Sequence, residues 1–390
     1  MLFSRLISLL GEINLGGMKV AIVHYWFISR RGGEKVVESL LKIFPKADIY
    51  TLFYDQETYG DYIKHHNIYT SILNKKYLRK HYQKLFPLYP IGIRSLHLKK
   101  KYDLIISSES GPAKGIVINN DTPHISYIHT PMRYCWSHRN EYLNSVKSIY
   151  RPLMNFFLNR LKRWDITTVD NVDLYLANSE NVARRIKKYY HKNAIVVYPP
   201  IANELFTKPL VEKKRDIFLS FGAITPYKKI DLLVEVFNKN GKNLVIIGDG
   251  SEKEKLEKKA KANIKFKGML TWIDVENYLS RTKALIFPGE EDLGMVPLEV
   301  MAYGIPVIAF GKGGALETVV ENRSDCTTST GIFFNKQTVD SVQNSIDFFE
   351  NIKGDFNPLY IRNHARKFSE DMFIANIHRQ VEKIIDINEN

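Results

Sequence analysis

The sequence predicts an α/β protein built from two parallel, doubly wound sheets, each covered by helices on both faces. The chain has 390 residues, 44% hydrophobic and 25% charged, a length that suits two α/β domains of similar size. Short apolar runs alternate with helical patterns, as in sheets whose strands are buried on both faces. The pair Pro199-Pro200 continues neither a strand nor a helix, so it marks the hinge between the domains.

The predicted first domain covers residues 18–200 and opens on a buried strand. Residues 1–17 precede this strand, and their apolar stretch is too short to cross a membrane. We expect them to form an N-terminal extension, with a weak interfacial anchor as the alternative. A helix is expected over 181–190. Apolar runs predict strands at 19–24, 104–107, 125–128, 174–178 and 194–198.

The predicted second domain covers residues 201–367 and resumes the alternation, with a helix expected over 252–261. The segment 368–390 follows, with a helical pattern over 369–385 and Ser369 as its N-cap. Apolar runs predict strands at 218–222, 243–247, 264–267, 284–287 and 306–310.

The net charge of +14 is unevenly distributed along the chain. Residues 1–200 carry 30 Lys/Arg and 15 Asp/Glu, whereas residues 201–390 carry 26 and 27. The densest part, 75–101, holds nine Lys/Arg, no acid and several aromatic residues. Such a surface suits an anionic bilayer, a phosphorylated substrate or nucleic acid, or it is only a solvated helical face. The two cysteines, Cys135 and Cys326, form no disulfide framework or metal-ligand pattern, so we expect a reducing compartment.

The most informative segment is 287–307, which reads FPGEEDLGMVPLEVMAYGIPV. A strand ends at Phe287, a polar loop leads to Gly294, and Pro297 suits the first position of a short helix. The junction presents the backbone N–H groups of Gly294, Met295 and Val296, which together with the helix dipole form an anion site suited to a diphosphate.

Two carboxylates flank this predicted phosphate site, Glu291 before the loop and Glu299 in the first turn of the helix. Carboxylates beside a phosphate would repel it, but they accept hydrogen bonds well from sugar hydroxyls. The loop is therefore expected to hold phosphates, and the two acids to hold the two sugars of a nucleotide-sugar.

This segment resembles the signature of retaining glycosyltransferases of family 4, which have the GT-B fold. The resemblance rests on Glu291 and Glu299 with seven residues between them, followed by Met-Ala-x-Gly-x-Pro-Val. It implies that Glu299 binds the nucleotide ribose and Glu291 the transferred sugar. It also implies two Rossmann-like domains facing across a cleft, with the C-terminal helix crossing back to the first domain.

Further segments of the second domain resemble the same family. Lys228 matches a lysine that neutralises the donor diphosphate, with Gly222 just before it in the same loop, whereas Ala223 stands where the family has an arginine. Lys229 is a candidate replacement for that arginine. By resemblance, Gly268 and Met269 lie near the nucleotide base. Residues 311–318 resemble the family's Gly-Gly-x-x-Glu segment, although each of these loops also suits a plain turn.

The first domain carries two candidate segments. Gly32 and Gly33 lie in a turn after the first strand, where backbone N–H groups suit a phosphate or the acceptor. His129 and Arg133 belong to the string His-Thr-Pro-Met-Arg, which follows a strand and resembles mannosyltransferase-like members of the family. The resemblance implies that His129 contacts the donor sugar; a buried structural histidine is the alternative.

We therefore expect a metal-independent enzyme with no cofactor that transfers a hexose, with GDP-mannose as the favoured donor. The expected acceptor is a glycan or lipid-linked glycan of cell-surface polysaccharide or glycoconjugate synthesis. We expect the protein to lie at the cytoplasmic face of the cell membrane, where its basic first domain binds the anionic lipid surface. We do not expect it to bind nucleic acid. The alternatives are a catalytically weak or silent sugar-nucleotide-binding protein, suggested by Ala223, and an epimerase of the same fold.

Overall fold

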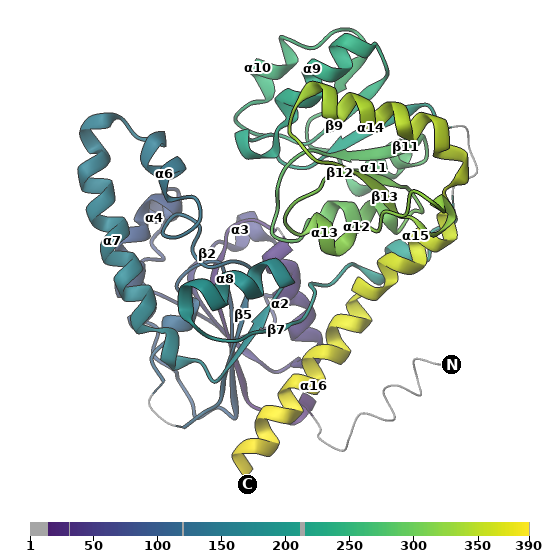
Figure 1. Ribbon diagram of the computed structural model, residues 1–390. Coiled ribbons are helices and arrows are strands. Elements are labelled where there is room, and N and C mark those ends of the chain that lie inside the picture. The colour runs from purple at the N-terminus through teal and green to yellow at the C-terminus, as the bar shows by residue number, and fades with distance from the viewer. Residues whose placement is uncertain (1–14, 31, 119–120, 211–214, 390) are drawn as a thin grey trace. The chain divides into compact units, whose positions relative to one another are not determined.

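The computed structural model describes residues 15–30, 32–118, 121–210 and 215–389. The chain divides into two compact units (Figure 1): unit 1 comprises residues 1–200 and 371–390, and unit 2 comprises residues 201–370. The division falls directly after the Pro199-Pro200 pair. No helix in the described part of the chain is long and apolar enough to span a bilayer.

Unit 1 contains a seven-stranded sheet of parallel strands in the order β3-β2-β1-β4-β5-β6-β7. Its strands are β1 (Val20–Phe27), β2 (Asp48–Tyr54), β3 (Ile68–Thr70), β4 (Leu104–Glu109), β5 (His124–Ile128), β6 (Leu174–Ala177) and β7 (Ile195–Val196). Its helices are α2 (Gly32–Ile43), α3 (Gln56–Tyr59), α4 (Lys76–Arg79), α5 (Tyr89–Arg94), α6 (Arg139–Ser145), α7 (Arg151–Thr167), α8 (Glu180–Tyr190) and α16 (Glu370–Glu389).

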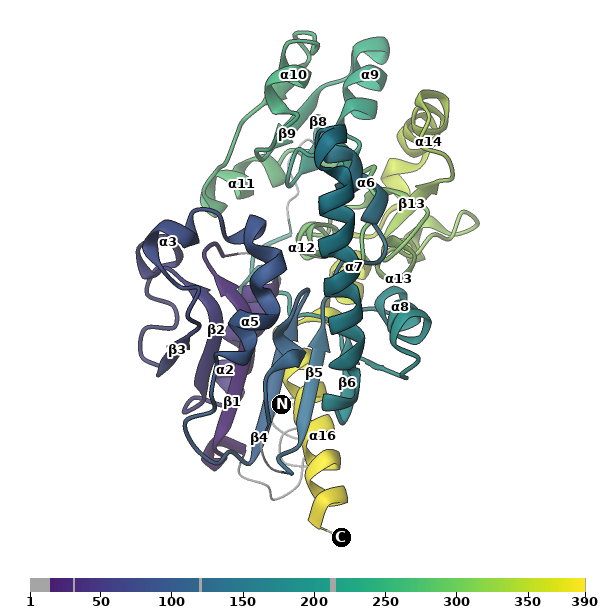
Figure 2. The same ribbon diagram turned by 90° about the vertical axis from the view of Figure 1, so that its left-hand side faces the viewer.

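Both faces of the unit 1 sheet are covered (Figure 2). Alternate residues of β1 point to opposite faces, so that Ile22 packs with α2 and α16, whereas Val23 packs with α5. In α16, Phe373 and Val381 are buried in the same core as α2. The helix expected over 369–385 is confirmed, and it begins at Glu370 and continues to Glu389.

Unit 2 contains a six-stranded parallel sheet in the order β10-β9-β8-β11-β12-β13. Its strands are β8 (Ile217–Phe221), β9 (Leu244–Ile247), β10 (Ile264–Phe266), β11 (Thr282–Phe287), β12 (Val307–Phe310) and β13 (Gly331–Phe334). Its helices are α9 (Ile230–Asn240), α10 (Lys253–Glu257), α11 (Trp272–Leu279), α12 (Met295–Met301), α13 (Ala315–Thr318), α14 (Val339–Ile352) and α15 (Pro358–Ala365). Phe218 of β8 packs against Phe237 of α9 and Phe349 of α14, which fixes these helices on one face.

The two parallel sheets confirm the predicted fold class, but several local predictions were wrong. The sequence pattern missed β2, β3 and β13. β3 is a partly exposed edge strand of three residues, held by pairing to β2 rather than by an apolar run of its own. The helix expected over 252–261 is only α10, because Lys259 and Ala260 donate to carbonyls three residues back and end the helix in a tight turn.

The expected extension 1–17 lies largely outside the described residues. Its described part, η1 (Leu15–Gly17), is a turn of 3₁₀ helix. Leu15 is only 4% exposed and belongs to the core that contains β1, α2 and α16. The described core of unit 1 therefore includes a residue three positions before residue 18, the predicted start.

Candidate functional site

The carboxylate loop of unit 2 runs from the end of β11 to the start of α12. Gly294 has a φ of 89°, a left-handed conformation that a glycine adopts without strain, and it caps α12. The helix begins at Met295, so the prediction that Pro297 occupies the first helical position was wrong. Pro297 is the third helical residue, where its missing N–H still costs no intrahelical hydrogen bond. Glu299 accordingly lies in the second turn, not in the first.

The glycine loop after β12 holds the carboxylate loop from behind. The backbone N–H of Gly314 donates to the carbonyl of Glu291 at 2.8 Å. A Cβ atom at Gly313 would lie 2.4 Å from the Glu291 carbonyl oxygen, and one at Gly314 would lie 2.1 Å from Cα of Leu293. Only glycines allow these two backbones to approach so closely.

Lys228 and Glu291 are in direct contact, with the lysine ammonium donating to a carboxylate oxygen. Lys228 lies in η7 (Pro226–Lys228), after β8, and its side chain is 16% exposed, whereas that of Glu291 is 20% exposed. Gly289 fits closely against this turn, because a Cβ atom there would lie 3.1 Å from Cα of Lys228. The fold thus joins the two predicted residues in one partly buried ion pair.

Of the other predicted donor residues of unit 2, Gly222 lies near the carboxylate loop, whereas Gly268 and Met269 follow a more distant strand. Gly222 lies beside α12, since a Cβ atom there would be 4.0 Å from the side chain of Val296. Gly268 follows β10, two strands from β8, and its carbonyl accepts the N–H of Gly248 at 2.8 Å. Met269 is 76% exposed.

The two positions that concern the missing arginine lie on either side of Lys228. Ala223 is exposed just after β8, which leaves room for a longer side chain. Lys229 has a φ of 57°, a left-handed conformation uncommon for a residue with a side chain, and it leads the backbone from η7 into α9.

In unit 1, three polar side chains meet at the carboxyl ends of β1, β4 and β5. His129 directly follows β5, as predicted, and its Nε2 lies 2.9 Å from Oγ of Ser108. Nδ1 of His24 is hydrogen-bonded to the carbonyl of Ser108 at 2.8 Å. Nε2 of His24 lies 3.8 Å from Glu34, and both of these side chains are buried.

His129 is held in its neutral form. Removal from water by the packed surroundings lowers the pKa of His129 to about 3, and the nearby His24 adds to this effect. At neutral pH the ring is therefore uncharged, so it can exchange hydrogen bonds with a ligand but cannot supply a positive charge.

The remaining predicted residues of unit 1 lie around His129. Gly32 and Gly33 form the first two residues of α2, so the expectation that they lie in a turn was wrong. A Cβ atom at Gly33 would lie 3.4 Å from Nε2 of His129. Arg133 is partly exposed in the loop after β5, which is fixed by the buried Met132 and Cys135.

Sequence reasoning missed three residues of this cluster: His24, Glu34 and Ser108. Ser108 could have been found, because the polar Ser107-Ser108-Glu109 ends an apolar strand next to the one that leads to His129. His24 and Glu34 gave no comparable signal, since a histidine in a buried strand and a glutamate in the first turn of a helix are both ordinary.

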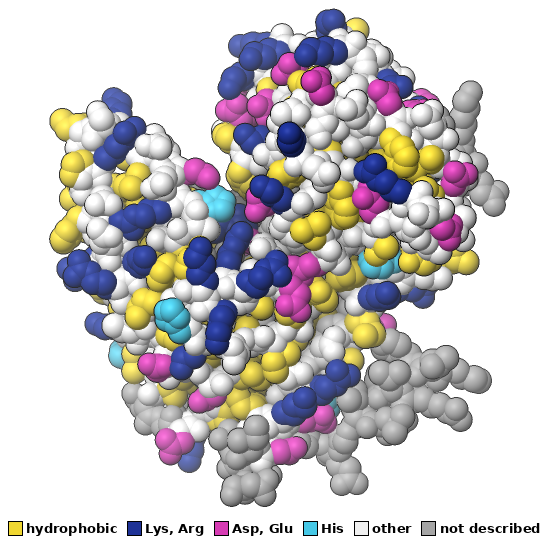
Figure 3. Space-filling model, in the orientation of Figure 1, with side chains coloured by type: hydrophobic (Ala, Val, Ile, Leu, Met, Phe, Trp, Pro, Cys, Tyr) yellow, Lys and Arg dark blue, Asp and Glu magenta, His cyan; other side chains and the backbone are white. Residues whose placement is uncertain are grey.

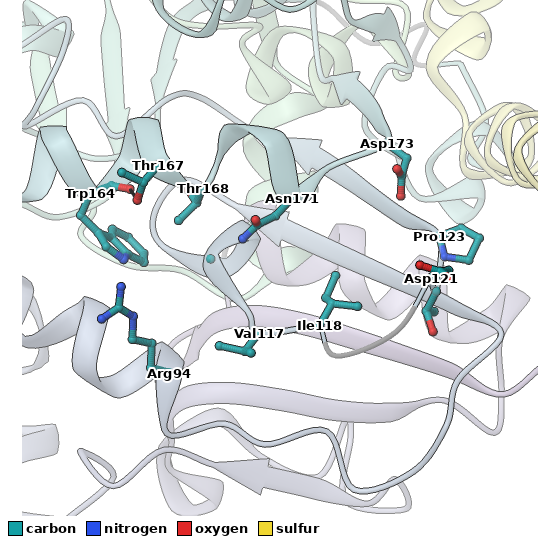
Figure 4. A pocket seen from close by; sticks show the side chains of 12 residues that line it. Arg94, Val117, Ile118, Asp121, Pro123, Trp164, Thr167, Thr168, Asn171 and Asp173 are labelled. Atoms are coloured by element: carbon teal, nitrogen blue, oxygen red, sulfur yellow. Dashed lines mark hydrogen bonds between the residues drawn. The ribbon is translucent and has the colours of Figure 1, made fainter.

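A cavity of about 530 Å³ lies elsewhere in unit 1 (Figure 4). Thr122 and Pro123 precede β5 and Asp173 precedes β6, so the cavity opens at the amino ends of these strands. His129 follows the carboxyl end of β5. The cavity therefore lies away from the predicted site residues of this unit.

Comparison with known proteins covers both units. Residues 30–204 match the model of Glycosyltransferase Family 4, and residues 201–368 match that of Glycosyl transferases group 1. An uncharacterized glycosyltransferase of Methanocaldococcus jannaschii is 26% identical over 313 residues, 78% of this chain and 82% of that protein. Alpha-1,3/1,6-mannosyltransferase ALG2 of Candida glabrata is 24% identical over 233 residues, 47% of this chain and 50% of that protein.

Solved structures with the same fold align over almost the whole chain. Sucrose-phosphate synthase of Thermosynechococcus elongatus superposes with a TM-score of 0.72 at 15% identity, covering 95% of this chain and 100% of that one. HepE of Anabaena, solved with UDP and glucose, gives a TM-score of 0.67 at 16% identity, covering 95% and 99%.

Proposed function

The chain belongs to glycosyltransferase family 4, with the GT-B fold, and on this basis we propose that it transfers a hexose from a nucleoside-diphosphate sugar to a glycan or lipid-linked glycan. The transfer proceeds with retention of anomeric configuration and without a metal ion or other cofactor. GDP-mannose is the favoured donor, and the product belongs to a cell-surface polysaccharide or glycoconjugate.

The contact between Lys228 and Glu291 carries this proposal. An ammonium suits the diphosphate of a donor, and a carboxylate suits the hydroxyls of its hexose. Donor binding replaces the ion pair by these two interactions, so neither charge is left buried without a partner. Negative charge grows on the departing diphosphate during transfer, so the fixed lysine stabilises the transition state more than the bound donor.

The surrounding residues complete the proposed donor site. The N–H groups of Gly294, Met295 and Val296 face the diphosphate, and Glu299 accepts hydrogen bonds from the ribose. Lys229 adds a second cation, whereas Gly268 and Met269 contact the base. No side chain is assigned as nucleophile; the departing phosphate assists deprotonation of the acceptor hydroxyl.

Unit 1 supplies the acceptor side of the proposal. Gly32 and Gly33 at the start of α2, together with Arg133, hold the acceptor or its phosphate. The neutral ring of His129 hydrogen-bonds a sugar hydroxyl near the reacting carbon, and Ser108 orients that ring. A neutral ring is suited to this role because it adds no charge next to a sugar that develops positive charge in the transition state.

The choice of mannose rests on similarity to named proteins. ALG2 is named a mannosyltransferase, and its alignment spans half of its own length. HepE was solved with UDP and glucose, which makes a UDP-hexose the next donor to test. The exposed Ala223 supports the second candidate, a sugar-nucleotide-binding protein with weak or no turnover, because a cation expected beside the diphosphate is absent there.

The membrane proposal rests on the basic segment 75–101. Lys75, Lys76 and Lys80 are exposed, whereas Arg79 donates to the carbonyl of Tyr54 and pairs with Asp55. We propose that the exposed lysines bring unit 1 to the anionic cytoplasmic face of the membrane. Dark-blue Lys and Arg side chains are numerous over the unit 1 face shown in Figure 3.

The experiment that tests the function compares Glu291→Gln with Glu290→Gln, its exposed neighbour. Purified enzyme is incubated with GDP-mannose and with UDP-hexoses, and released nucleoside diphosphate is measured with and without acceptor. Glu291→Gln should lower turnover by about 10- to 100-fold, the value of one lost hydrogen bond to a charged group. Glu290→Gln should leave it unchanged. Donor binding by the wild type without turnover on any donor would favour the silent binding protein.

A further inference from the structure

The helical hairpin of unit 1 exposes an unusual number of large apolar side chains. It consists of α6, the short η4 (Ser148–Tyr150) and α7. Ile149, in η4, is 78% exposed, and four others are between 44% and 59% exposed, namely Tyr142, Tyr150, Leu153 and Phe156. Such side chains in one short segment mark a surface that binds something apolar.

The exposed face of α7 changes character along its length. Ile149, Leu153 and Phe156 recur at spacings of four and three residues, which places them on one side of the helical path. The same spacing continues with Arg160 and Arg163, which are also exposed. Because a helix rises 1.5 Å per residue, Arg160 follows Phe156 by about 6 Å along the axis. The stripe is apolar at the tip of the hairpin and basic behind it.

The positive charge around the hairpin tip favours an anionic lipid surface over a second copy of the chain as the partner. Residues 136–164 contain six Lys/Arg and a single acid, Glu141. Both yellow apolar and dark-blue basic side chains lie along the left edge of the face in Figure 3, where α7 lies in Figure 1. A second copy of this surface would bring like charges together, whereas an anionic lipid surface is attracted.

A groove between α6 and α7 adds polar groups beside the apolar tip. It is lined by Asn140, Asn144, Ser148, Arg151 and Asn155, along with Leu143 and Pro152. The guanidinium and the amides can donate hydrogen bonds to phosphate oxygens. Insertion of the tip would therefore bring the polar groups of this groove within reach of the lipid headgroups.

We propose that the α6–α7 hairpin inserts its tip into an anionic bilayer, with Ile149, Leu153 and Phe156 among the acyl chains and Arg160 and Arg163 among the headgroup phosphates. This deepens the membrane partner of the proposed function and names the element that enters the bilayer. The basic segment 75–101 lies next to it, because Phe86 of η2 (Tyr82–Leu88) packs in the same cluster as Leu158 of α7.

The first test measures binding to vesicles of phosphatidylcholine with and without phosphatidylglycerol. The variant Ile149→Ser/Leu153→Ser/Phe156→Ser should bind the anionic vesicles about tenfold or more weakly, because three apolar side chains no longer leave water. The control Leu359→Ser removes an equally exposed leucine from α15 of unit 2 and should bind like the wild type. Equal binding by the triple variant and the wild type would overturn the proposal.

The second test locates the inserted residues. Cys135 and Cys326 are both buried, so an environment-sensitive fluorophore can be attached selectively to Ile149→Cys or, as control, to Leu359→Cys. Anionic vesicles should shift the emission to the blue only for the label at position 149. A label at 149 that stays in water while the protein is vesicle-bound would contradict insertion of the hairpin. Sedimentation without vesicles is a further check. A dimeric wild type with a monomeric triple variant would show that the apolar tip binds a second copy of the chain, which would also contradict the proposal.

A third measurement separates this inference from the proposed function. None of the substituted hairpin residues belongs to the proposed donor or acceptor site, so the triple variant should keep wild-type donor turnover without vesicles. If the triple variant keeps both its donor turnover and its vesicle binding, insertion of the hairpin is rejected and the enzyme function is unaffected. If the hairpin tip inserts into vesicles but the protein turns over no donor, the membrane insertion is supported and the enzyme function is rejected.

Discussion

At the scale of single residues, Ala223 is a position at which the resemblance to family 4 implies an arginine. It is exposed at the end of β8, five residues before Lys228. Ala223→Arg should tighten the binding of the nucleotide-sugar donor by about tenfold, the effect of one added charge-assisted hydrogen bond to the diphosphate. Titration calorimetry with the donor measures the change.

The control for this prediction is Ala223→Gln, which adds length without a charge. It should bind the donor like the wild type. Equal affinity of the arginine and glutamine variants would show that this position does not face the diphosphate.

A second residue-scale feature is a buried charge cluster in unit 1. The ammonium of Lys114 contacts Asp165 and lies 3.5 Å from Glu109, and all three side chains are at most 2% exposed. Asp165 also accepts hydrogen bonds from Trp136 and Tyr190. Burial raises the pKa of Glu109 from 4.5 to about 7, although the Lys114 charge opposes the shift.

This raised pKa predicts a pH dependence of stability. Between pH 4.5 and 7 the folded state binds more protons at Glu109 than the unfolded state does. The free energy of unfolding should therefore fall as the pH rises through this window, by up to about 3 kcal/mol. Glu109→Gln should flatten the dependence, whereas Glu254→Gln, at an exposed position, should not. Urea unfolding across this pH range measures both slopes, and a Glu109→Gln slope equal to the wild type's would refute the assignment.

At the scale of elements, the site of unit 2 depends on two loops that support each other. The loop after β12 holds the loop after β11 through the bond from Gly314 to the Glu291 carbonyl. Glu291 lies in a loop, but Gly314 donates to its carbonyl, and Gly289, two residues before it, fits against the turn that carries Lys228. The position of the carboxylate therefore depends on the packing of glycines that do not themselves carry any chemistry.

Gly314→Ala tests this dependence. The added methyl group would lie 2.1 Å from Cα of Leu293, so the carboxylate loop must move, and we expect a loss of stability of about 1–3 kcal/mol together with weaker donor binding. Gly354→Ala is the matched control, because a Cβ atom there meets nothing within 4 Å. Wild-type stability and donor affinity in Gly314→Ala would show that the loops are not coupled.

At the scale of the whole molecule, the last helix is a structural part of unit 1. The chain leaves unit 1 after Pro200, builds unit 2, and returns from residue 371. Phe373 is 1% exposed, and its ring lies 5.8 Å from that of Tyr127 in β5. The core of unit 1 is therefore incomplete until the helix that contains Phe373 has been made.

Phe373→Ala should lower the free energy of unfolding of unit 1 by about 3–5 kcal/mol, because it leaves a cavity in the core. Trp26, Trp136 and Trp164 lie in unit 1 and only Trp272 lies in unit 2, so tryptophan fluorescence during urea unfolding reports mainly on unit 1. Leu359→Ala, at an exposed site, should change little. An unchanged unfolding midpoint for Phe373→Ala would show that the helix is not needed for the core.

Local patterns in the sequence were enough for much of the fold. Apolar runs predicted most strands of both sheets, and the string around Glu291 and Glu299 led to the correct family. The patterns failed at β3, because an edge strand takes its conformation from its partner, and at β13, whose four residues begin with a glycine. The helices α12 and α2 begin earlier than expected: α12 begins two residues before Pro297, and α2 begins at Gly32. Residues that favour a helix start can occupy more than one of the first helical positions.

The sequence by itself determined the α/β alternation and the family, and it supplied the candidate residues of the donor site. Only the tertiary structure decided which of these residues touch. Lys228 and Glu291 are 63 residues apart in the chain, and they form an ion pair. His24 comes from β1, Ser108 from β4, and His129 from the residue directly after β5. Parallel strands bring their carboxyl ends to one edge of a sheet, so groups far apart in the chain meet there, and no local pattern contains that information.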